Sequence, residues 1–241
     1  MLLEKDMKLA DVIHHDYNLI PVISRFGIML GFGDASIENI CEKNQINTDF
    51  FLIILNAFHD PQYLDNNYLQ SFSVKLLIDY LKKTHDYYLL NKIPEIEGLI
   101  SEMASESEVD KESHKLLEKF FEEYKYELIK HIEKEENRVY PYVLDLESAV
   151  TDKTVSPTLI SRIKEYSITS FEDEHDNVEE KLMDLKNIII KYLPASKNQH
   201  SLYKLLKELT VLEKDLGDHA RIEDLVLVPK VQILEKIITD N

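Results

Sequence analysis

The sequence is poor in cysteine and in glycine. Its single cysteine, Cys41, excludes an intrachain disulfide framework and a metal site built from several cysteines. Only five of the 241 residues are glycine, whereas leucine, isoleucine, lysine and glutamate are abundant. Because these four residues suit a helix interior and glycine does not, the composition predicts an all-α protein.

Basic residues are scarce relative to acidic ones. The chain has 28 lysines and arginines against 45 aspartates and glutamates, which gives a net charge of −17. A surface this acidic repels a phosphate backbone, which argues against nucleic acid as the partner. No apolar stretch has the roughly 18–20 residues that a membrane span needs. Charges interrupt the first residues, MLLEKD, too early for a signal peptide. We therefore expect a cytoplasmic protein without a membrane partner.

Prolines and small polar residues divide the chain into segments. We expect a small helical N-terminal domain at residues 1–62 and a helical bundle at residues 70–241. Pro94 and Pro194 are expected to end helices, and Ser156-Pro157 to begin one with an N-cap and a proline at the first helical position. The bundle should contain four long helices, at about 70–91, 111–147, 157–192 and 199–238.

Each expected helix has one apolar stripe, in which residues recur at steps of three and four. A single histidine interrupts every stripe: His85, His131, His175 and His219. The apolar members are Val74, Ile78, Leu81 and Tyr88; Leu117, Phe121, Tyr124, Leu128 and Val139; Ile168, Phe171, Val178, Leu182, Leu185 and Ile189; and Leu205, Leu209, Leu212, Leu216 and Val226. The histidines are 46, 44 and 44 residues apart. An up-and-down bundle would therefore bring them to one level.

Two of the histidines belong to a repeated motif. Residues 131–141 read HIEKEENRVYP and residues 219–229 read HARIEDLVLVP, so both contain His-x3-Glu-x5-Pro. Residues four apart lie on one helix face, roughly 5–6 Å from each other, so Glu135 and Glu223 can reach the same point as the preceding histidines. Six polar groups in one slice of a core would be costly without partners, and metal ions would convert them into ligands.

The donor set indicates the kind of metal. Four imidazoles and two carboxylates are too many for one tetrahedral zinc, and calcium and magnesium prefer shells of oxygen alone. Mixed nitrogen and oxygen ligands inside a four-helix bundle suit a pair of iron or manganese ions. Glu135 and Glu223 would bridge both ions, and two histidines would bind each ion. An oxo or hydroxo bridge would then leave one position open for a small molecule.

These ligands resemble those of hemerythrin-like di-iron proteins of the Repair of Iron Centers family. The segments LADVI, RFGIMLGFGD and IENICEKN, within residues 9–44, are similar to the small helical domain that precedes the bundle in that family. The resemblance covers nearly the whole chain. It implies an all-α, hemerythrin-like up-and-down four-helix bundle after a small helical domain. It also implies two iron ions held by His85, His131, Glu135, His175, His219 and Glu223.

The resemblance also implies a function. A cytoplasmic non-haem di-iron protein of this family helps to restore iron–sulfur clusters damaged by nitric oxide or peroxide under nitrosative or oxidative stress. Damaged iron–sulfur proteins would be its partners, and NO, O2 or peroxide its small ligand. The alternative is a hemerythrin-like module that binds O2 or NO as a sensor or carrier. A third hypothesis is a bundle without metal, and the sequence leaves open whether the protein is an enzyme.

The chain departs from the family pattern in its N-terminal segment. Family members carry adjacent cysteines where this chain has Gly31-Phe32, so the resemblance does not extend to a thiol-dependent step. Cys41 is expected to be a buried small residue. Residues 37–55 predict helix, turn and helix, with Thr48 as a cap. Because the second helix is almost wholly apolar, we expect it to pack or to dock a partner, including a second copy, rather than to bind DNA.

The bundle also differs from the oxygen-carrying hemerythrins. Those proteins have a second histidine where this chain has Glu179, and they end in His-x4-Asp, which Asp224 would satisfy. Glu223 is preferred as the ligand because Glu135 has the same spacing from its histidine. Glu136 and Asp224 lie about 100° around their helices from the seam and are expected to leave metal binding unchanged.

Other residues are candidates for a supporting role at the metals. Glu127 lies one turn before His131, and Glu174 immediately precedes His175. Either carboxylate would be placed to accept an imidazole N–H. The tyrosines are expected to pack within the bundle rather than to act as redox groups, and Tyr88, one step past His85 on the same stripe, could also lie near the metals.

Overall fold

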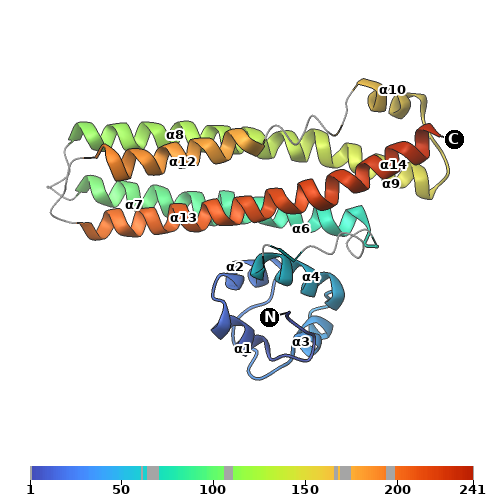
Figure 1. Ribbon diagram of the computed structural model, residues 1–241, viewed down its shortest axis with the longest axis horizontal. Coiled ribbons are helices and arrows are strands. Elements are labelled where there is room, and N and C mark those ends of the chain that lie inside the picture. Colours follow the sequence, from blue (N-terminus) through green and yellow to red (C-terminus); the bar gives the residue numbers. More distant parts are fainter. Residues whose placement is uncertain are drawn as a thin grey trace.

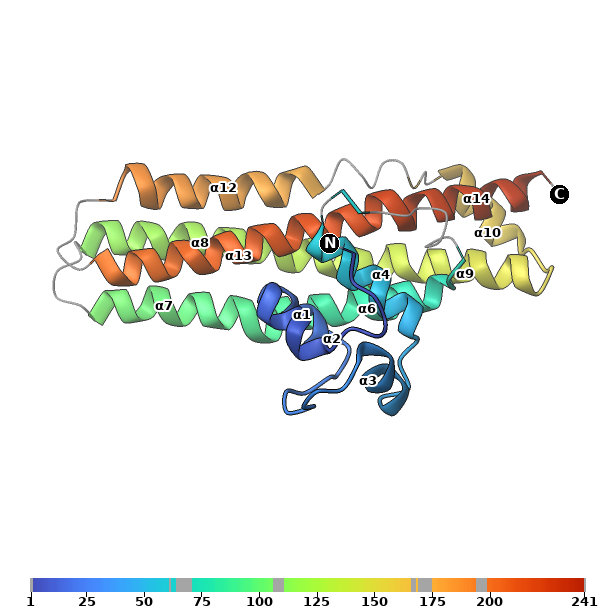
Figure 2. The same cartoon turned by 60° about the horizontal axis from the view of Figure 1, so that its bottom comes forward.

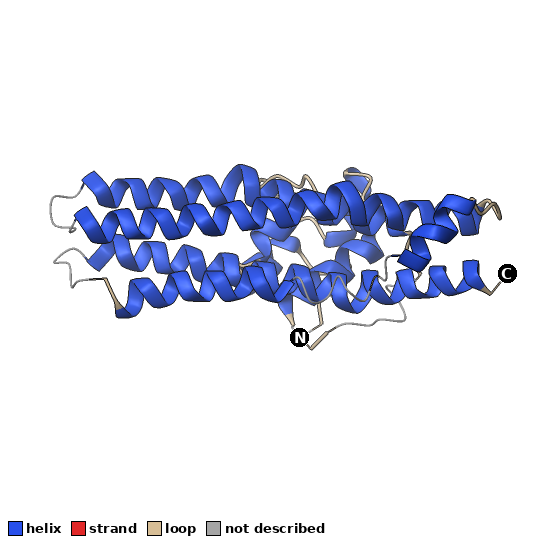
Figure 3. Cartoon of the chain, turned by 90° about the horizontal axis from the view of Figure 1, so that it is seen from above, coloured by secondary structure: helices blue, strands red, loops and turns tan. Residues whose placement is uncertain are grey.

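The computed structural model describes residues 2–60, 62–63, 71–105, 111–165, 168, 175–193 and 199–240. Within these ranges the regular elements are helices (Figure 3), which confirms the all-α prediction. An isolated bridge joins Lys8 and Ser36. The described helices include none that is long and apolar enough to cross a membrane.

Long helical rods lie side by side in the bundle (Figure 1), and Figure 2 gives a second view. The first rod comprises α6 (Val74–Tyr87), the π-helical segment η1 (Tyr88–Lys92) and α7 (Ile93–Ser105). The second comprises α8 (Lys111–Lys134), η2 (Glu135–Val139) and α9 (Tyr140–Thr151). The third is described as two separate helices, α10 (Pro157–Glu165) and α12 (His175–Lys191), and the fourth comprises α13 (Gln199–Ile222), η3 (Glu223–Leu227) and α14 (Val228–Thr239).

The contacts between helices define a closed bundle. Helix α8 packs against α7 and α12, and α13 packs against the same two helices. At the other end α9 packs against α6 and α14. This arrangement confirms the predicted four-helix bundle.

A proline follows the π-helical segment in the first, second and fourth rods. The residue after each segment donates its N–H to the carbonyl of the first residue in that segment, five positions earlier. The next residue is a proline: Pro94, Pro141 or Pro229. The wider π turn gives the proline ring room beside the preceding turn, where a regular α-helix would produce a clash. The first rod therefore continues beyond Pro94, and the prediction that this proline ends the helix is wrong.

The third rod differs from the single helix predicted at 157–192. It is described as two helices, of which α10 packs against α14 and α12 packs against α8 and α13. Helix α10 begins where predicted, because Ser156 Oγ accepts a hydrogen bond from the Leu159 N–H at 3.1 Å. The expected helix end at Pro194, and Phe171 of the predicted stripe, lie outside the described residues.

The predicted stripes form the core of the bundle. Each of their apolar members whose side chain is described is at most 8% exposed. The core has two hydrophobic clusters. One includes Tyr88, Leu128 and Leu216, and the other includes Leu81 and Val139. In the first, second and fourth rods the histidine lies where these clusters meet.

Four short helices precede the bundle: α1 (Leu9–His15), α2 (Leu19–Arg25), α3 (Ile37–Lys43) and α4 (Thr48–His59). Helix α2 packs against α4 and against α6 of the bundle. The cap of α4 is Asn47 rather than Thr48, because the Asn47 side chain accepts a hydrogen bond from the Phe50 N–H. The apolar residues of α4 are mostly buried within the chain, which accounts for their character, while a homodimer stays a prediction.

The predicted domain boundary falls largely outside the described residues. Residues on both sides of it contribute to one hydrophobic cluster, so α1–α4 and the nearer half of the bundle share a core. The division at 62 and 70 therefore stays a prediction. Below, residues 2–60 are called the N-terminal unit.

Cys41 and Gly31 lie in the N-terminal segment, where the chain lacks the adjacent cysteines of the family that it resembles. Cys41 is 0% exposed, and burial raises the pKa of its thiol to about 11, so it is a buried small residue as predicted. Gly31 has a φ of +101°, a conformation that residues with a side chain rarely adopt. A cysteine at that position would strain the present loop.

Candidate metal centre

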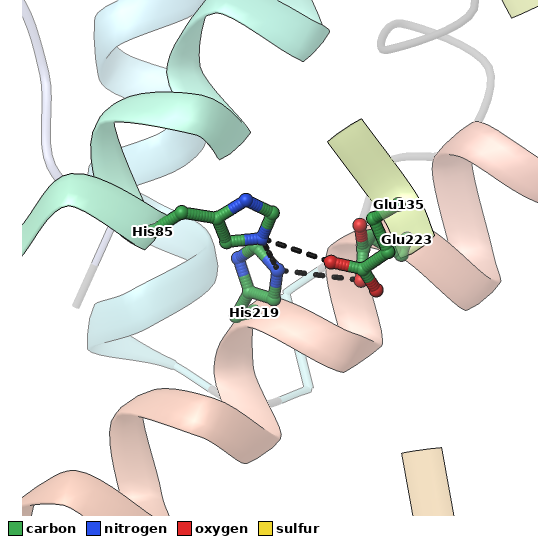
Figure 4. Close-up of side chains that lie close together, drawn as sticks. All are labelled: His85, Glu135, His219 and Glu223. Carbon is green, nitrogen blue, oxygen red and sulfur yellow. Dashed lines mark hydrogen bonds and ion pairs between the residues drawn. The ribbon is translucent and has the colours of Figure 1, made fainter. Parts of the chain in front are cut away.

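Four side chains converge inside the bundle where the two hydrophobic clusters meet. Figure 4 shows His85 of α6 and His219 of α13 facing Glu135 of η2 and Glu223 of η3. One ligand atom from each residue lies within 4.8 Å of all the others. All four residues are at most 4% exposed. Two imidazoles and two carboxylates in so small a buried volume form a donor set suited to a cation.

The π-helical segments place both carboxylates. Glu135 is the first residue of η2, and Glu223 is the first residue of η3. Each lies four residues after a histidine, so histidine and glutamate share a helix face up to this point. The π turn then advances the bonding register by one residue, which turns the following residues to a different face.

The two oxygens of Glu135 face different histidines. Glu135 Oε2 lies 3.0 Å from His85 Nε2, and Glu135 Oε1 lies 2.8 Å from His131 Nε2. This is the orientation that a carboxylate needs in order to bridge two cations. On the fourth rod Glu223 Oε2 lies 3.3 Å from His219 Nε2, which in turn lies 3.2 Å from His85 Nε2.

The two remaining predicted ligands are placed differently. The His131 side chain is 13% exposed and contacts Glu135, but it is not part of the four-residue cluster. His175 is the first residue of α12, and its side chain lies outside the described part of the chain. Among the described residues the structure therefore brings four of the six predicted ligands together and places a fifth, His131, beside them.

Glu136 contacts the nitrogen of the His85 ring that faces away from the cluster. The Nδ1 atom of His85 lies 2.9 Å from Glu136 Oε1, while its Nε2 faces the cluster. A carboxylate that accepts the Nδ1–H fixes the ring orientation and leaves Nε2 available to a metal. Our expectation that Glu136 lies apart from the metals is thus wrong, because η2 turns it toward the first rod. Glu127 instead pairs with Lys181 at 3.2 Å.

Tyr140 contacts two residues of the cluster, Glu223 and His85. Its hydroxyl donates a hydrogen bond to Glu223 Oε1 at 2.7 Å, and its ring lies nearly parallel to that of His85, with centroids 5.7 Å apart. Burial, and then the charges of Glu223 and Glu135, raise the pKa of the hydroxyl, so Tyr140 stays a hydrogen-bond donor. The sequence offered no signal for this role, because Tyr140 is one residue away from the predicted stripe. The other candidate for support, Glu174, lies outside the described residues.

The carboxylates also set the protonation of His85. Burial alone would lower its pKa, but the hydrogen bond and charge of Glu135, with the charge of Glu223, raise it above the ordinary value of 6.5. The metal-free cluster thus favours a positive charge at the position of the proposed ions. A bound cation would take the place of this proton.

A small cavity adjoins the cluster. His85, Tyr88, His131 and His219 line it together with the apolar side chains of Leu128, Ile132, Val178 and Leu216. Its volume is about 20 Å³, which is room for about one water-sized molecule. Tyr88 therefore lies where predicted, close to the candidate metal ligands.

Comparison with known families agrees with this geometry. The sequence model of the hemerythrin HHE cation-binding domain matches residues 76–231. The chain belongs to the hemerythrin HHE family. The matched region contains all six predicted ligands, and its buried His/Glu cluster makes the chain a hemerythrin-like, cation-binding protein. A search of curated proteins gave no match.

Proposed function

We propose that this hemerythrin-like protein holds two iron ions and acts in the repair of iron–sulfur clusters. The observation that carries the di-iron centre is the orientation of Glu135, whose oxygens face His85 on one side and His131 on the other. One ion would be bound by His85 and His219, and the other by His131 and His175. Glu135 and Glu223 would bridge the pair, with an oxo or hydroxo group as a further bridge.

The bound ions would supply redox chemistry and an open coordination position, and the chain supplies the surroundings. Glu136 orients His85, and Tyr140 holds one oxygen of Glu223. The cavity beside the histidines is mostly apolar and has room for about one small molecule. NO, O2 and peroxide are ligands of this size, whereas a metabolite of ordinary size would not fit.

The repair role rests on the resemblance to the Repair of Iron Centers family. The ligand spacing and the segments within residues 9–44 support it together, because the family combines such a bundle with such an N-terminal domain. The protein would then be cytoplasmic, and its partners would be damaged iron–sulfur proteins. Gly31 and Phe32 occupy the place of the family cysteines, so the proposed activity relies on the metal centre rather than on thiols there.

A rescue assay tests this proposal. An iron–sulfur hydratase inactivated by nitric oxide or peroxide would be incubated with the iron-loaded protein, and its activity would be followed. We expect recovery with the wild-type protein and little recovery with Glu135→Ala, which loses the bridging carboxylate. If both proteins restore activity no better than the same amount of ferrous iron in solution, the repair role is wrong.

A sensor or carrier of O2 or NO is the second candidate. It is favoured by the direct contacts between the N-terminal unit and α13, the helix that carries His219: Arg25 pairs with Asp215, and Arg221 donates to the Ala57 carbonyl. Such contacts would give the N-terminal unit a way to respond to occupancy of the cavity. Reversible NO binding without rescue of the hydratase would favour this candidate.

A further inference from the structure

Arg25 connects the N-terminal unit to the interior of the bundle. It is the last residue of α2, and its side chain is 1% exposed. Its guanidinium forms an ion pair with Asp215 of α13 and lies 4.6 Å from the ring centroid of Tyr87. Burial opposes a charge on Arg25, but Asp215 together with Tyr80 and Tyr88 raises the pKa of the guanidinium. The pair is thus a desolvated ion pair between segments 190 residues apart.

Asp215 connects Arg25 to Tyr88, a residue beside the metal centre. It lies one helical turn before His219, and its Oδ1 accepts a hydrogen bond from the Tyr88 hydroxyl at 2.9 Å. The Tyr88 ring meets the His219 ring at 75°, with centroids 6.0 Å apart, and lines the small cavity. Asp215 itself lines a different cleft, of about 270 Å³, between the N-terminal unit and α13. Tyr88 therefore has its ring at the metal cavity and its hydroxyl bonded to a residue of the neighbouring cleft.

This arrangement determines what the cavity offers to a ligand. While the Tyr88 hydroxyl donates its hydrogen bond to Asp215, it points out of the cavity and cannot donate to a ligand there. The ion pair with Arg25 holds the Asp215 side chain in this buried position.

We propose that Arg25 is a positioning residue, by which the N-terminal unit holds the Tyr88 hydroxyl out of the cavity through Asp215. When this ion pair is absent, Tyr88 loses its acceptor and its hydroxyl becomes available to a polar ligand in the cavity. The N-terminal unit thereby sets how strongly the cavity retains such a ligand. The retention part of this inference rests on the proposed function, whereas the positioning of Tyr88 does not.

The test compares four full-length proteins: the wild type, Arg25→Met/Asp215→Leu, Tyr88→Phe and the triple variant. The double substitution removes both charges together, so it leaves no uncompensated charge in the core. Lys5→Gln/Glu38→Gln is the matched control, because it removes an exposed ion pair of the N-terminal unit with a spacing of 2.7 Å. Iron content is measured in every variant and should match the wild type.

The first readout uses metal-free protein labelled with ¹³C-tyrosine. Tyr88→Phe identifies the Tyr88 resonance in the NMR spectrum. We expect Arg25→Met/Asp215→Leu to shift this resonance, and the control pair to leave it in place. An unshifted resonance overturns the proposal. A further protein, which leaves Asp215 in place and also serves if the double variant fails to fold, is Arg25→Lys. That variant keeps the charge but loses the planar guanidinium, and we expect a smaller shift in the same direction; no shift overturns the proposal there too.

The second readout is the rate of NO dissociation from the reduced, iron-loaded protein, with a haem protein as scavenger. A new donor in the cavity should slow dissociation by about tenfold in Arg25→Met/Asp215→Leu. The triple variant should dissociate at the rate of Tyr88→Phe. Slowing that persists in the triple variant would mean that Arg25 does not act through the Tyr88 hydroxyl, and it overturns the proposal. If the wild type binds no NO but the Tyr88 resonance shifts in Arg25→Lys, which leaves Asp215 in place, the proposed function fails and the positioning role of Arg25 stands.

Discussion

Replacing Glu136 by alanine should weaken metal binding although Glu136 is not a predicted ligand. Its Oε1 lies 2.9 Å from His85 Nδ1, and the opposite nitrogen of this ring faces the cluster. Loss of such an outer partner typically reduces metal affinity 10- to 100-fold. Because the Glu136 side chain is 33% exposed, water can replace part of the lost contact. We therefore expect a loss of about tenfold, or about 1.4 kcal/mol.

Anaerobic competition between the metal-free protein and a coloured ferrous chelator measures this affinity. Glu136→Gln keeps an acceptor oxygen and should lose less than Glu136→Ala. Glu133→Ala is the matched control, because it removes the same charge from an exposed position of the same rod. If Glu136→Ala and Glu133→Ala bind iron equally well, the hydrogen bond to His85 does not support the metal and our reasoning is wrong.

Three further predictions concern the cluster itself. Tyr140→Phe removes a buried hydrogen bond to Glu223, so the free energy of unfolding of the metal-free protein should fall by about 1.5–3 kcal/mol, measured by urea denaturation; an unchanged midpoint would contradict this. Because the pKa of His85 is raised in the folded state, its contribution to the stability of the metal-free protein is full below pH 6.5 and is lost as the pH rises through the folded pKa. The difference in melting temperature between wild type and His85→Gln should therefore shrink between pH 6 and pH 8.5, and a constant or growing difference would refute the assignment. Glu223→Ala should lose metal while Asp224→Ala keeps it, and the reverse result would indicate the ligand pattern of the oxygen carriers.

The helices and their buried faces could be predicted from the sequence because they follow from short-range periodicity. Leu212 and Leu128, for example, each belong to a stripe of apolar residues that repeat at helical spacing. The described apolar members of each stripe are buried. The histidines interrupt these stripes at similar separations, and Glu135 and Glu223 follow two of them by four residues. These two patterns pointed to His85, Glu135, His219 and Glu223, which the structure brings together. Polar groups at one level of four apolar stripes are costly unless they share a function.

The π-helical segments could not be predicted in this way. They add one residue to a turn, so a stripe extrapolated from the first half of a rod is out of register in the second half. This is why Glu136 and Tyr140 were missed although both contact predicted ligands. The same feature explains why Pro94 does not end the first rod.

Polar contacts between residues far apart in the sequence could not be predicted either. Arg25 and Asp215 are 190 residues apart, and neither belongs to a motif. No local pattern distinguishes a basic residue that remains in solvent from one that inserts into a neighbouring bundle. Only the packing of α2 against α6 brings the Arg25 side chain to Asp215.

The proposed function depends most on a pair of iron ions bridged by Glu135. The most direct measurement is the metal content per chain of protein purified from iron-replete cells, together with its near-ultraviolet absorption, for wild type and Glu135→Ala. We expect close to two irons per chain and the absorption of oxo-bridged ferric iron in the wild type. We expect Glu135→Ala to lose at least one ion. A wild-type protein that carries one zinc and no iron would contradict the proposed pair of iron ions.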